Sequence, residues 1–346
     1  MENEQNIDNQ QSINIDLHEE QQQNTFFEQR TDLSNLSFAV SNIKTQIQKV
    51  IVGQEDMLEL LIAGILCNGH VLLEGLPGVA KTLTAKLLAK SINVPFNRIQ
   101  FTPDLMPSDV IGTSVFNPQQ GTFNFKKGPI FSSIVLIDEV NRSPAKTQTA
   151  LLEVMEERQI TTDGVTYPMN KPFLIIATQN PVEQEGTYRL PEAQLDRFLF
   201  KINVPYPTAE QEVKIIAAHQ KAKGQHLTTS IDAVLNADDV IKAQEKINEI
   251  HVEEKIINFI ASIVCATRND KALFLGASPR ASIGLLNASK AIAGMRGRDF
   301  VNPDDVLHVV EPILCHRLIV TPEKEMEGIT PEMVVRDIVK KIEVPR

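Results

Sequence analysis

Apolar residues are spaced in two ways along the chain, and their spacing distinguishes predicted strands from predicted helices. Unbroken apolar runs of strand length, expected where helices cover both faces of a sheet, begin at Val71, Ile134 and Phe173. Elsewhere apolar residues recur every three or four positions, as they do on one face of a helix. Helical spacing dominates after residue 208, so the pattern predicts an α/β unit followed by a helical unit.

Five strands and two hairpins are predicted in the first unit. The strands are expected at 71–73, 95–101, 134–139, 173–178 and 198–204. Paired runs around a turn predict hairpins at Val115–Phe125 and Gln159–Met169, the second around Asp163-Gly164, a strong hairpin turn signal. The predicted fold class is therefore α/β: a five-stranded parallel sheet with helices on both faces, followed by an all-α domain.

Composition divides the chain into three parts. Residues 1–35 are rich in Gln, Asn and Glu and poor in apolar residues, which is typical of a flexible tail. Tyr206-Pro207 ends the α/β unit, assigned to 36–206, and a capping box from Thr208 to Gln211 opens the helical domain, 207–346. Helices are expected there at about 209–221, 237–249, 253–268, 279–295, 303–317 and 331–341.

A glycine-rich loop joins the first predicted strand to a helix, and this order is typical of a phosphate-binding loop. The string matches G-x-x-x-x-G-K-[ST], except that Ala80 replaces the second glycine. We expect the Ala80 methyl group to be tolerated if this residue has helical φ and ψ. Lys81 would bind the β and γ phosphates of ATP, and the Thr82 hydroxyl would ligate Mg²⁺. The candidate nucleotide-binding residues are Gly75, Leu76, Pro77, Gly78, Val79, Ala80, Lys81, Thr82 and Leu83.

Polar side chains end the next buried strands. Asp138 and Glu139 close the strand at 134–139, at the edge where open α/β sheets bind ligands. Asp138 is a candidate to hold Mg²⁺ and Glu139 to orient an attacking water molecule, although an acidic pair at this point is often a solvated turn. Asn180 follows the strand at 173–178 and could bind the γ phosphate or the water, or serve as a turn residue before Pro181.

A Val-Gly-Gln corner separates two predicted helices ahead of the phosphate loop. Val52 could contact an adenine base, and the backbone at Gly53 could hydrogen-bond it. A simple link between two helices explains the same residues.

Charge and composition argue against several classes of protein, although a ring could still concentrate its basic residues in a pore. Residues 1–35 hold eight acidic residues against Arg30 alone, so the remainder carries only −3 of the net charge of −10. A near-neutral body lacks the clustered cations that nucleic acid demands. The three cysteines have no metal or disulfide spacing, and no apolar run approaches membrane-spanning length. Because the N-terminus also lacks a signal-type segment, we expect a cytoplasmic protein.

Several long strings, taken with these motifs, resemble the MoxR family of AAA+ ATPases. The resemblance extends from Ile51 to about Arg317, and the strings are VGQED, GLPGVAKT, IDEVNRSPAKTQTALLEVMEERQIT, ATQNPVEQEGTYRLPEAQLDRF and GASPRA. It implies an AAA+ P-loop core whose two hairpins are the helix 2 insert and the pre-sensor 1 hairpin, both facing a ring pore. It also implies that the helical domain is the lid.

The resemblance implies a role for each polar candidate. Lys81 and Thr82 would be the Walker A groups, Asp138 and Glu139 the Walker B pair, and Asn180 sensor 1. Arg280 resembles sensor 2, which touches the γ phosphate from the lid. Arg197 resembles the arginine finger that acts on ATP bound by a neighbouring subunit. Arg189 and Arg142 are alternatives for that finger.

By the same resemblance, the partners are further copies of the chain in a hexameric ring, a protein with a von Willebrand factor type A domain, and a client complex that needs assembly or metal insertion. A ring follows physically, because an arginine supplied in trans accelerates phosphoryl transfer by about 10³ to 10⁵. Three rival interpretations are a nucleic-acid motor, a nucleotide-gated scaffold without turnover, and a small-molecule kinase. The first would need basic or aromatic residues at the hairpin tips: Lys126 and Lys127 flank the first hairpin, whereas the turn at 162–164 of the second carries no positive charge.

Overall fold

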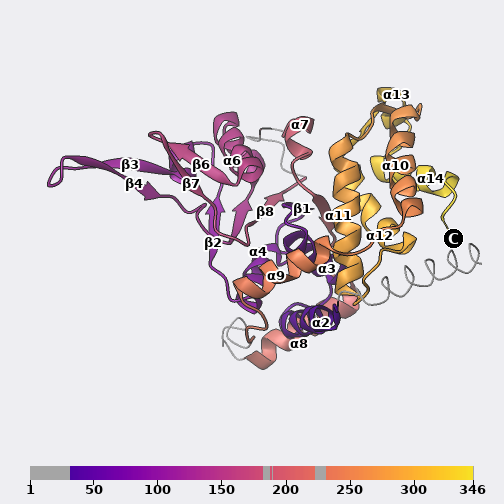
Figure 1. The fold of residues 1–346 in the computed structure, drawn as a ribbon, viewed down its shortest axis with the longest axis horizontal. Coiled ribbons are helices and arrows are strands. Elements are labelled where there is room, and N and C mark those ends of the chain that lie inside the picture. The colour runs from indigo at the N-terminus through magenta and orange to yellow at the C-terminus, as the bar shows by residue number, and fades with distance from the viewer. Residues whose placement is uncertain (1–31, 182–187, 189, 223–230, 346) are drawn as a thin grey trace, which may run out of the picture.

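The computed structural model describes residues 32–181, 188, 190–222 and 231–345 (Figure 1). Its centre is a five-stranded parallel sheet in the order β2-β5-β8-β1-β9. The strands are β2 (Phe96–Gln100), β5 (Ile134–Asp138), β8 (Leu174–Gln179), β1 (Val71–Gly75) and β9 (Phe200–Val204). The predicted fold class is confirmed, and each strand lies within two residues of its predicted bounds.

Helices cover both faces of this sheet, which explains why β1, β5 and β8 begin as unbroken apolar runs, whereas the edge strands β2 and β9 carry polar side chains as well. In β1, Val71 and Leu73 join one buried cluster, whereas Leu72 between them joins another. The first cluster is built with α2 (Ser34–Gln48), α3 (Glu55–Leu66) and α4 (Lys81–Ser91), and the second with α6 (Ala145–Glu157). Alternate side chains of a strand point to opposite faces, so both faces of β1 are buried.

The register of the strands gathers their carboxyl ends at one edge. Gln100 at the end of β2 pairs with Asp138 at the end of β5, and Leu73 near the end of β1 pairs with Thr178 near the end of β8. The loop after β1, the acids after β5 and the residues after β8 therefore meet. We call this the carboxyl edge of the sheet and the opposite one the amino edge.

Two hairpins form one projection, which extends to the left in Figure 1 and which we call the hairpin arm. It consists of β3 (Gly112–Asn117) with β4 (Thr122–Lys127), and β6 (Gln159–Thr162) with β7 (Val165–Pro168). The Phe125 and Tyr167 rings lie 4.7 Å apart, and Ser114 hydrogen-bonds Asp163. Both hairpins were predicted. The short helix α5 (Pro107–Ile111) precedes the first of them.

Helices make up most of the C-terminal region. They are α7 (Glu192–Leu195), α8 (Ala209–Ala222), α9 (Ala237–Asn248), α10 (Glu254–Asn269), α11 (Pro279–Met295), α12 (Pro303–Leu314), α13 (Pro322–Met326) and α14 (Pro331–Lys341). The prediction missed a small antiparallel pair, β10 (Leu273–Leu275) with β11 (Ile319–Val320). Its strands of three and two residues are too short to show a period of two. The helix expected to reach residue 317 ends at Leu314, followed by a 3₁₀ turn at Cys315–Arg317.

The predicted segment boundaries differ from the packing at two places. Helix α2 begins at Ser34, inside the segment assigned to the tail, because Leu33 and Leu36 are buried. One hydrophobic cluster contains residues of β1 as well as of α9 to α12, so residue 206 does not separate two cores. Across the described residues, no helix is both long and apolar enough to cross a membrane.

Candidate functional site

The loop between β1 and α4 has the backbone of an anion cradle, and each small residue in it has a separate reason. A Cβ at Gly75 would lie 2.7 Å from the Val204 carbonyl oxygen, so β9 excludes a side chain there. Gly78 has φ +86°, a conformation that L side chains rarely adopt. Helix α4 starts at Lys81, and its N-terminus points the free backbone N–H groups and the positive end of the helix dipole at this loop.

Ala80 corrects our expectation for this loop. It is not helical but left-handed, with φ 60° and ψ 20°. A glycine is common at this point because the left-handed region costs an L residue about 1–2 kcal/mol. The Ala80 methyl group packs against the large buried cluster, which offsets part of that cost.

Lys81 is folded back over the loop. Its Nζ donates a 2.6 Å hydrogen bond to the carbonyl oxygen of Gly75. Burial lowers the pKa of Lys81 from its usual value, and the carboxylates of Asp138, Glu139 and Glu74 act in the opposite direction. The ammonium group is therefore partly desolvated and lies near three carboxylates, with its hydrogen bond to Gly75 directing it over the loop.

A cavity of about 370 Å³ brings most of the sequence-predicted residues together. Its predicted members are Pro77, Gly78, Val79, Ala80, Lys81, Thr82, Leu83, Asp138, Glu139 and Asn180. Three further residues that the sequence prediction missed, Arg98, Gln100 and Thr178, complete the lining. Gly75 and Leu76 shape the loop without lining the cavity.

The corner at Val52–Gly53 also lies outside the cavity lining. Gly53 has φ +72° and is covered by the Gln211 side chain of α8. The next residue, Gln54, donates a 2.7 Å hydrogen bond to the Val79 carbonyl oxygen and so ties the corner to the phosphate loop. The adenine contact at Val52 and Gly53 stays a prediction.

The three residues that the sequence prediction missed form hydrogen bonds with Asp138 and Glu139. Arg98 Nε donates to Asp138 Oδ2 at 2.6 Å, and Thr178 Oγ1 donates to Asp138 Oδ1 at 3.1 Å. Gln100 Nε2 donates to Glu139 Oε2 at 2.8 Å. Arg98 and Gln100 stand two apart on β2, so both side chains leave the same face of the strand beside β5. A pair of long polar residues at i and i+2 in a predicted strand was the available signal.

Glu139 also contacts an arginine that was an alternative candidate for the finger. Arg142 Nε lies 3.1 Å from Glu139 Oε2, in the 3₁₀ turn that follows β5. Arg142 therefore forms an ion pair with Glu139 of its own chain. Arg189, the other alternative, lies outside the described residues.

The cavity fits a magnesium ion by its donors. Asp138 is buried, with 7% of its surface exposed, and its carboxylate already balances one positive charge, that of Arg98. Thr82, a hydroxyl donor, lines the same cavity. Mg²⁺ usually takes one or two protein oxygen ligands and completes its shell with phosphate oxygens and water. Among the described residues, no group of three or more His, Cys, Asp or Glu side chains is arranged to hold a metal ion.

Arg197 and Arg280 lie at the amino edge, away from this cavity. Arg197 comes three residues before β9, which pairs in parallel with β1 from Phe200 opposite Val71. The five-residue strand β1 separates this edge from the phosphate loop by about 17 Å. There, Glu156 at the end of α6 accepts a 2.6 Å hydrogen bond from Arg280 and lies 3.6 Å from Arg197. Neither arginine reaches the phosphate loop of its own chain.

Asp196 anchors the start of α11 beside these arginines. It accepts a 2.6 Å hydrogen bond from the buried Arg317 and one of 3.1 Å from Ser278, the residue before α11. Arg317 Nη2 also donates to the Phe198 carbonyl oxygen at 2.7 Å. The start of α11, which carries Arg280, is therefore anchored to the segment that carries Arg197.

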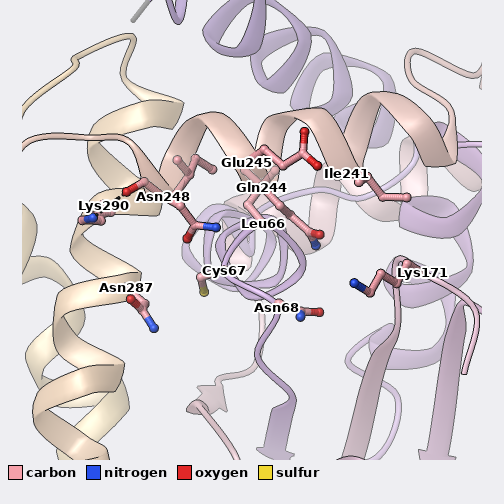
Figure 2. Close-up of a pocket in the computed structure, with 11 residues that line it drawn as sticks. Leu66, Cys67, Asn68, Lys171, Ile241, Gln244, Glu245, Asn248, Asn287 and Lys290 are labelled. Carbon is pink, nitrogen blue, oxygen red and sulfur yellow. Dashed lines mark hydrogen bonds between the residues drawn. The ribbon is translucent and has the colours of Figure 1, made fainter. Parts of the chain in front are cut away.

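A second cavity, of about 210 Å³, lies between α3, α9 and α11 (Figure 2). Lys171 and Lys290 stand on opposite sides of it, and amide side chains such as Gln244 and Asn287 line much of the rest. Glu245 is the single carboxylate among its described lining residues. Without a paired acid or a phosphate loop it offers no hydrolytic chemistry, so the cavity at the carboxyl edge is the candidate active site.

Comparisons with known proteins point to one family. Residues 70–200 match the model of the ATPase family associated with various cellular activities (AAA), and residues 265–338 match an AAA lid domain. Chaperone MoxR1 of Mycobacterium tuberculosis is 43% identical over 310 residues, covering 87% of this chain and 81% of that protein. The uncharacterized protein YeaC of Bacillus subtilis is 46% identical over 299 residues, covering 86% and 92%. A crystal structure of a protein from Cytophaga hutchinsonii is 43% identical, with a TM-score of 0.83, and the match covers 90% of this chain and 96% of that one.

Proposed function

The chain belongs to the MoxR family of AAA+ ATPases, and we propose on that basis that it hydrolyses Mg²⁺-ATP in a hexameric ring to remodel other proteins. The observation that carries the hydrolytic part is the convergence of the phosphate loop, Asp138, Glu139 and Asn180 on one cavity. These are the groups that phosphoryl transfer to water requires.

Each residue of the cavity has a proposed role in that reaction. The loop N–H groups and Lys81 hold the phosphates, and Asn180 hydrogen-bonds the γ phosphate or the attacking water. Glu139 orients that water and accepts its proton as the bond between the γ phosphorus and the bridging oxygen breaks. Thr82 and Asp138 hold Mg²⁺, which when bound neutralises phosphate charge.

Separation of the arginines from the phosphate loop supports a ring. Arg197 and Arg280 are half-exposed at the amino edge, with 32% and 44% of their side chains accessible. A second copy whose carboxyl edge faced this amino edge would present its nucleotide to both. Repetition of such a head-to-tail contact closes a ring when the rotation between copies allows it, and we propose six copies.

Mixing two inactive variants tests the shared site. Glu139→Gln should bind ATP without hydrolysing it, and Arg197→Ala should bind ATP with turnover reduced by about 10³. When the two are mixed, some sites combine the intact Glu139 of one copy with the intact Arg197 of another, so hydrolysis should reappear. If the mixture stays as inactive as its components, the arginine does not act across a subunit boundary. Lys81→Ala, which should abolish ATP binding, is the control for a site that binds no nucleotide.

The hairpin arm supports a protein client. Val115, Phe116 and Phe123 are at least 49% exposed, and the centroids of the Phe116 and Phe123 rings lie 5.2 Å apart with the ring planes tilted by 54°. Exposed apolar surface of this kind marks contacts with other proteins. We propose that the arm contacts a client complex, and that a protein with a von Willebrand factor type A domain acts as adaptor.

The alternative, a nucleic-acid motor, would use the same arm differently. Lys127 already lies over the Phe131 ring, and the turns at 118–121 and 163–164 carry no basic residue. Pull-down with the Glu139→Gln variant, locked with ATP, should retain a protein. Salt-dependent retention of DNA instead would favour the nucleic-acid motor.

A further inference from the structure

Glu156 joins two arginines that come from different parts of the chain. Its Oε1 accepts a 2.6 Å hydrogen bond from Arg280 Nη2, at the start of α11, and its Oε2 lies 3.6 Å from Arg197 Nε, just before β9. One carboxylate therefore lies between two guanidinium groups. All three side chains are between 32% and 44% exposed, so the cluster faces solvent.

The position of Glu156 on α6 is electrostatically unfavourable without these partners. It is the penultimate residue of the helix, where the backbone dipole places partial negative charge. Glu157 lies in the same last turn, which contains no basic residue, and Glu153 precedes that turn. The two arginines compensate the carboxylate, and the carboxylate in turn shields two like charges from each other.

Among the described residues, Glu156 and Asp196 leave donors of Arg197 and Arg280 for a further anion. Arg197 faces Glu156 through Nε, so the four N–H bonds of its two terminal nitrogens are not used by Glu156. Arg280 uses Nη2 for Glu156, while its Nη1 stands 3.8 Å from Asp196, beyond hydrogen-bond distance. Arg197, Arg280 and Arg317 carry three positive charges against two carboxylates, Glu156 and Asp196, so the cluster keeps one positive charge.

We propose that Glu156 is a positioning residue that holds Arg197 and Arg280 side by side, so that both guanidinium groups meet one phosphate group of a nucleotide bound by a second copy of this chain. This rests on the proposed function, because the phosphate comes from the facing cavity. Without Glu156, Arg280 loses its closest hydrogen-bond partner and repels Arg197. The two arginines then reach the same phosphate less often.

Glu156→Gln is the direct test, because it removes the charge and keeps the shape. At saturating Mg²⁺-ATP we expect kcat to fall about tenfold, as for loss of an interaction that acts only in the transition state, while KM changes less than about twofold. Glu157→Gln is the matched control. It removes the same charge from the next exposed residue of the same helix, which makes no ion pair within the described part of the chain, and should leave kcat unchanged.

A second measurement separates positioning from a merely structural role. In the Arg197→Ala, Arg280→Ala background, Glu156→Gln should lower kcat no further, because there is nothing left to position. An equal fall in that background, or a kcat equal to wild type in the single variant, would overturn the role of Glu156 and leave the shared active site standing. Wild-type turnover in both arginine variants would overturn the shared site and, with it, this proposal. Melting temperatures of all variants show whether each is folded.

Discussion

Arg98 Nε lies 2.6 Å from Asp138 Oδ2, so the carboxylate proposed to hold Mg²⁺ is already paired with a cation of its own chain. The Asp138 side chain is 10% exposed and that of Arg98 53%, so the acid is held in place while the arginine can swing into solvent. A divalent ion that arrives with the nucleotide must compete with this contact.

Removal of Arg98 should therefore strengthen metal binding. In Arg98→Ala, we expect the Mg²⁺ concentration for half-maximal hydrolysis to fall about threefold or more, since a buried carboxylate without its cation binds a dication more strongly. Without metal, the same variant should unfold at a lower temperature than wild type. Activity titrations with Mg²⁺ at fixed ATP provide the measurement, and an increased Mg²⁺ requirement would show that Arg98 orients Asp138 instead.

Gln100 should restrain Glu139 in the same way. Its 2.8 Å hydrogen bond occupies the oxygen Oε2, which Arg142 also approaches. Gln100→Ala frees that oxygen, so we expect hydrolysis at saturating ATP to change by several-fold with KM for ATP nearly constant, since Glu139 acts on water and not on nucleotide binding. Gln119→Ala, in the exposed turn of the hairpin arm, is a control of matched size. A change confined to KM would contradict this role for Gln100.

Ala80→Gly should be tolerated and mildly stabilising. Glycine removes the cost of about 1–2 kcal/mol that alanine carries in the left-handed conformation. Two effects lower the free energy of unfolding by about 1 kcal/mol together: the loss of a partly buried methyl group and the greater conformational freedom of glycine in the unfolded chain. We expect an increase of up to about 1 kcal/mol in the free energy of unfolding, measured by urea denaturation, with unchanged ATP affinity. Ala80→Val should destabilise, because β-branched residues tolerate positive φ least. Equal stability of the glycine and valine variants would contradict the observed backbone.

We expect the buried His70 to make the free energy of unfolding decrease at acidic pH. Burial lowers its pKa to about 3, helped by the positive charge of Arg158, and its two ring nitrogens hydrogen-bond the Ile175 N–H and the Met155 carbonyl. Because the unfolded chain takes up a proton near pH 6.5 and the folded chain does not, stability is full above about pH 6.5. Below it, each unit of pH should cost about 1.4 kcal/mol until the pKa near 3.

Urea denaturation at several pH values between 7 and 5 measures that slope. His316 is buried and its pKa is lowered as well, so it adds to the effect. His70→Gln, which can retain one of the hydrogen bonds, should give a shallower slope, whereas His219→Gln on the exposed face of α8 should not. An unchanged slope in His70→Gln would exclude His70 as its source.

Most of the sheet could be predicted from sequence because β1, β5 and β8 begin as apolar runs and are followed by turn signals. β5 and β8 were located to within a residue for this reason. The hairpin around Asp163-Gly164 was equally local, because two residues with positive φ set its turn. What sequence reasoning missed depends on contacts between distant segments. Arg98 and Gln100 matter only because β2 lies next to β5, and no local pattern determines strand order.

The position of Arg280 and the conformation of Ala80 show the same limit. Arg280 lies beside Glu156, 124 residues earlier in the chain, because Asp196 and Arg317 fix where α11 begins. Ala80 is left-handed because the loop must turn into α4, although alanine itself prefers the right-handed helix. In both cases tertiary structure decides the outcome.

Helix α6 starts just after the 3₁₀ turn that carries Arg142 beside Glu139, and it ends with Glu156 beside Arg197 and Arg280. Over a length of about 20 Å, one helix thus connects the Arg142–Glu139 pair, at the edge of the sheet where the nucleotide would bind, with the arginines proposed to act on a neighbouring copy. If copies join as proposed, each α6 therefore links one nucleotide site to the next around the ring.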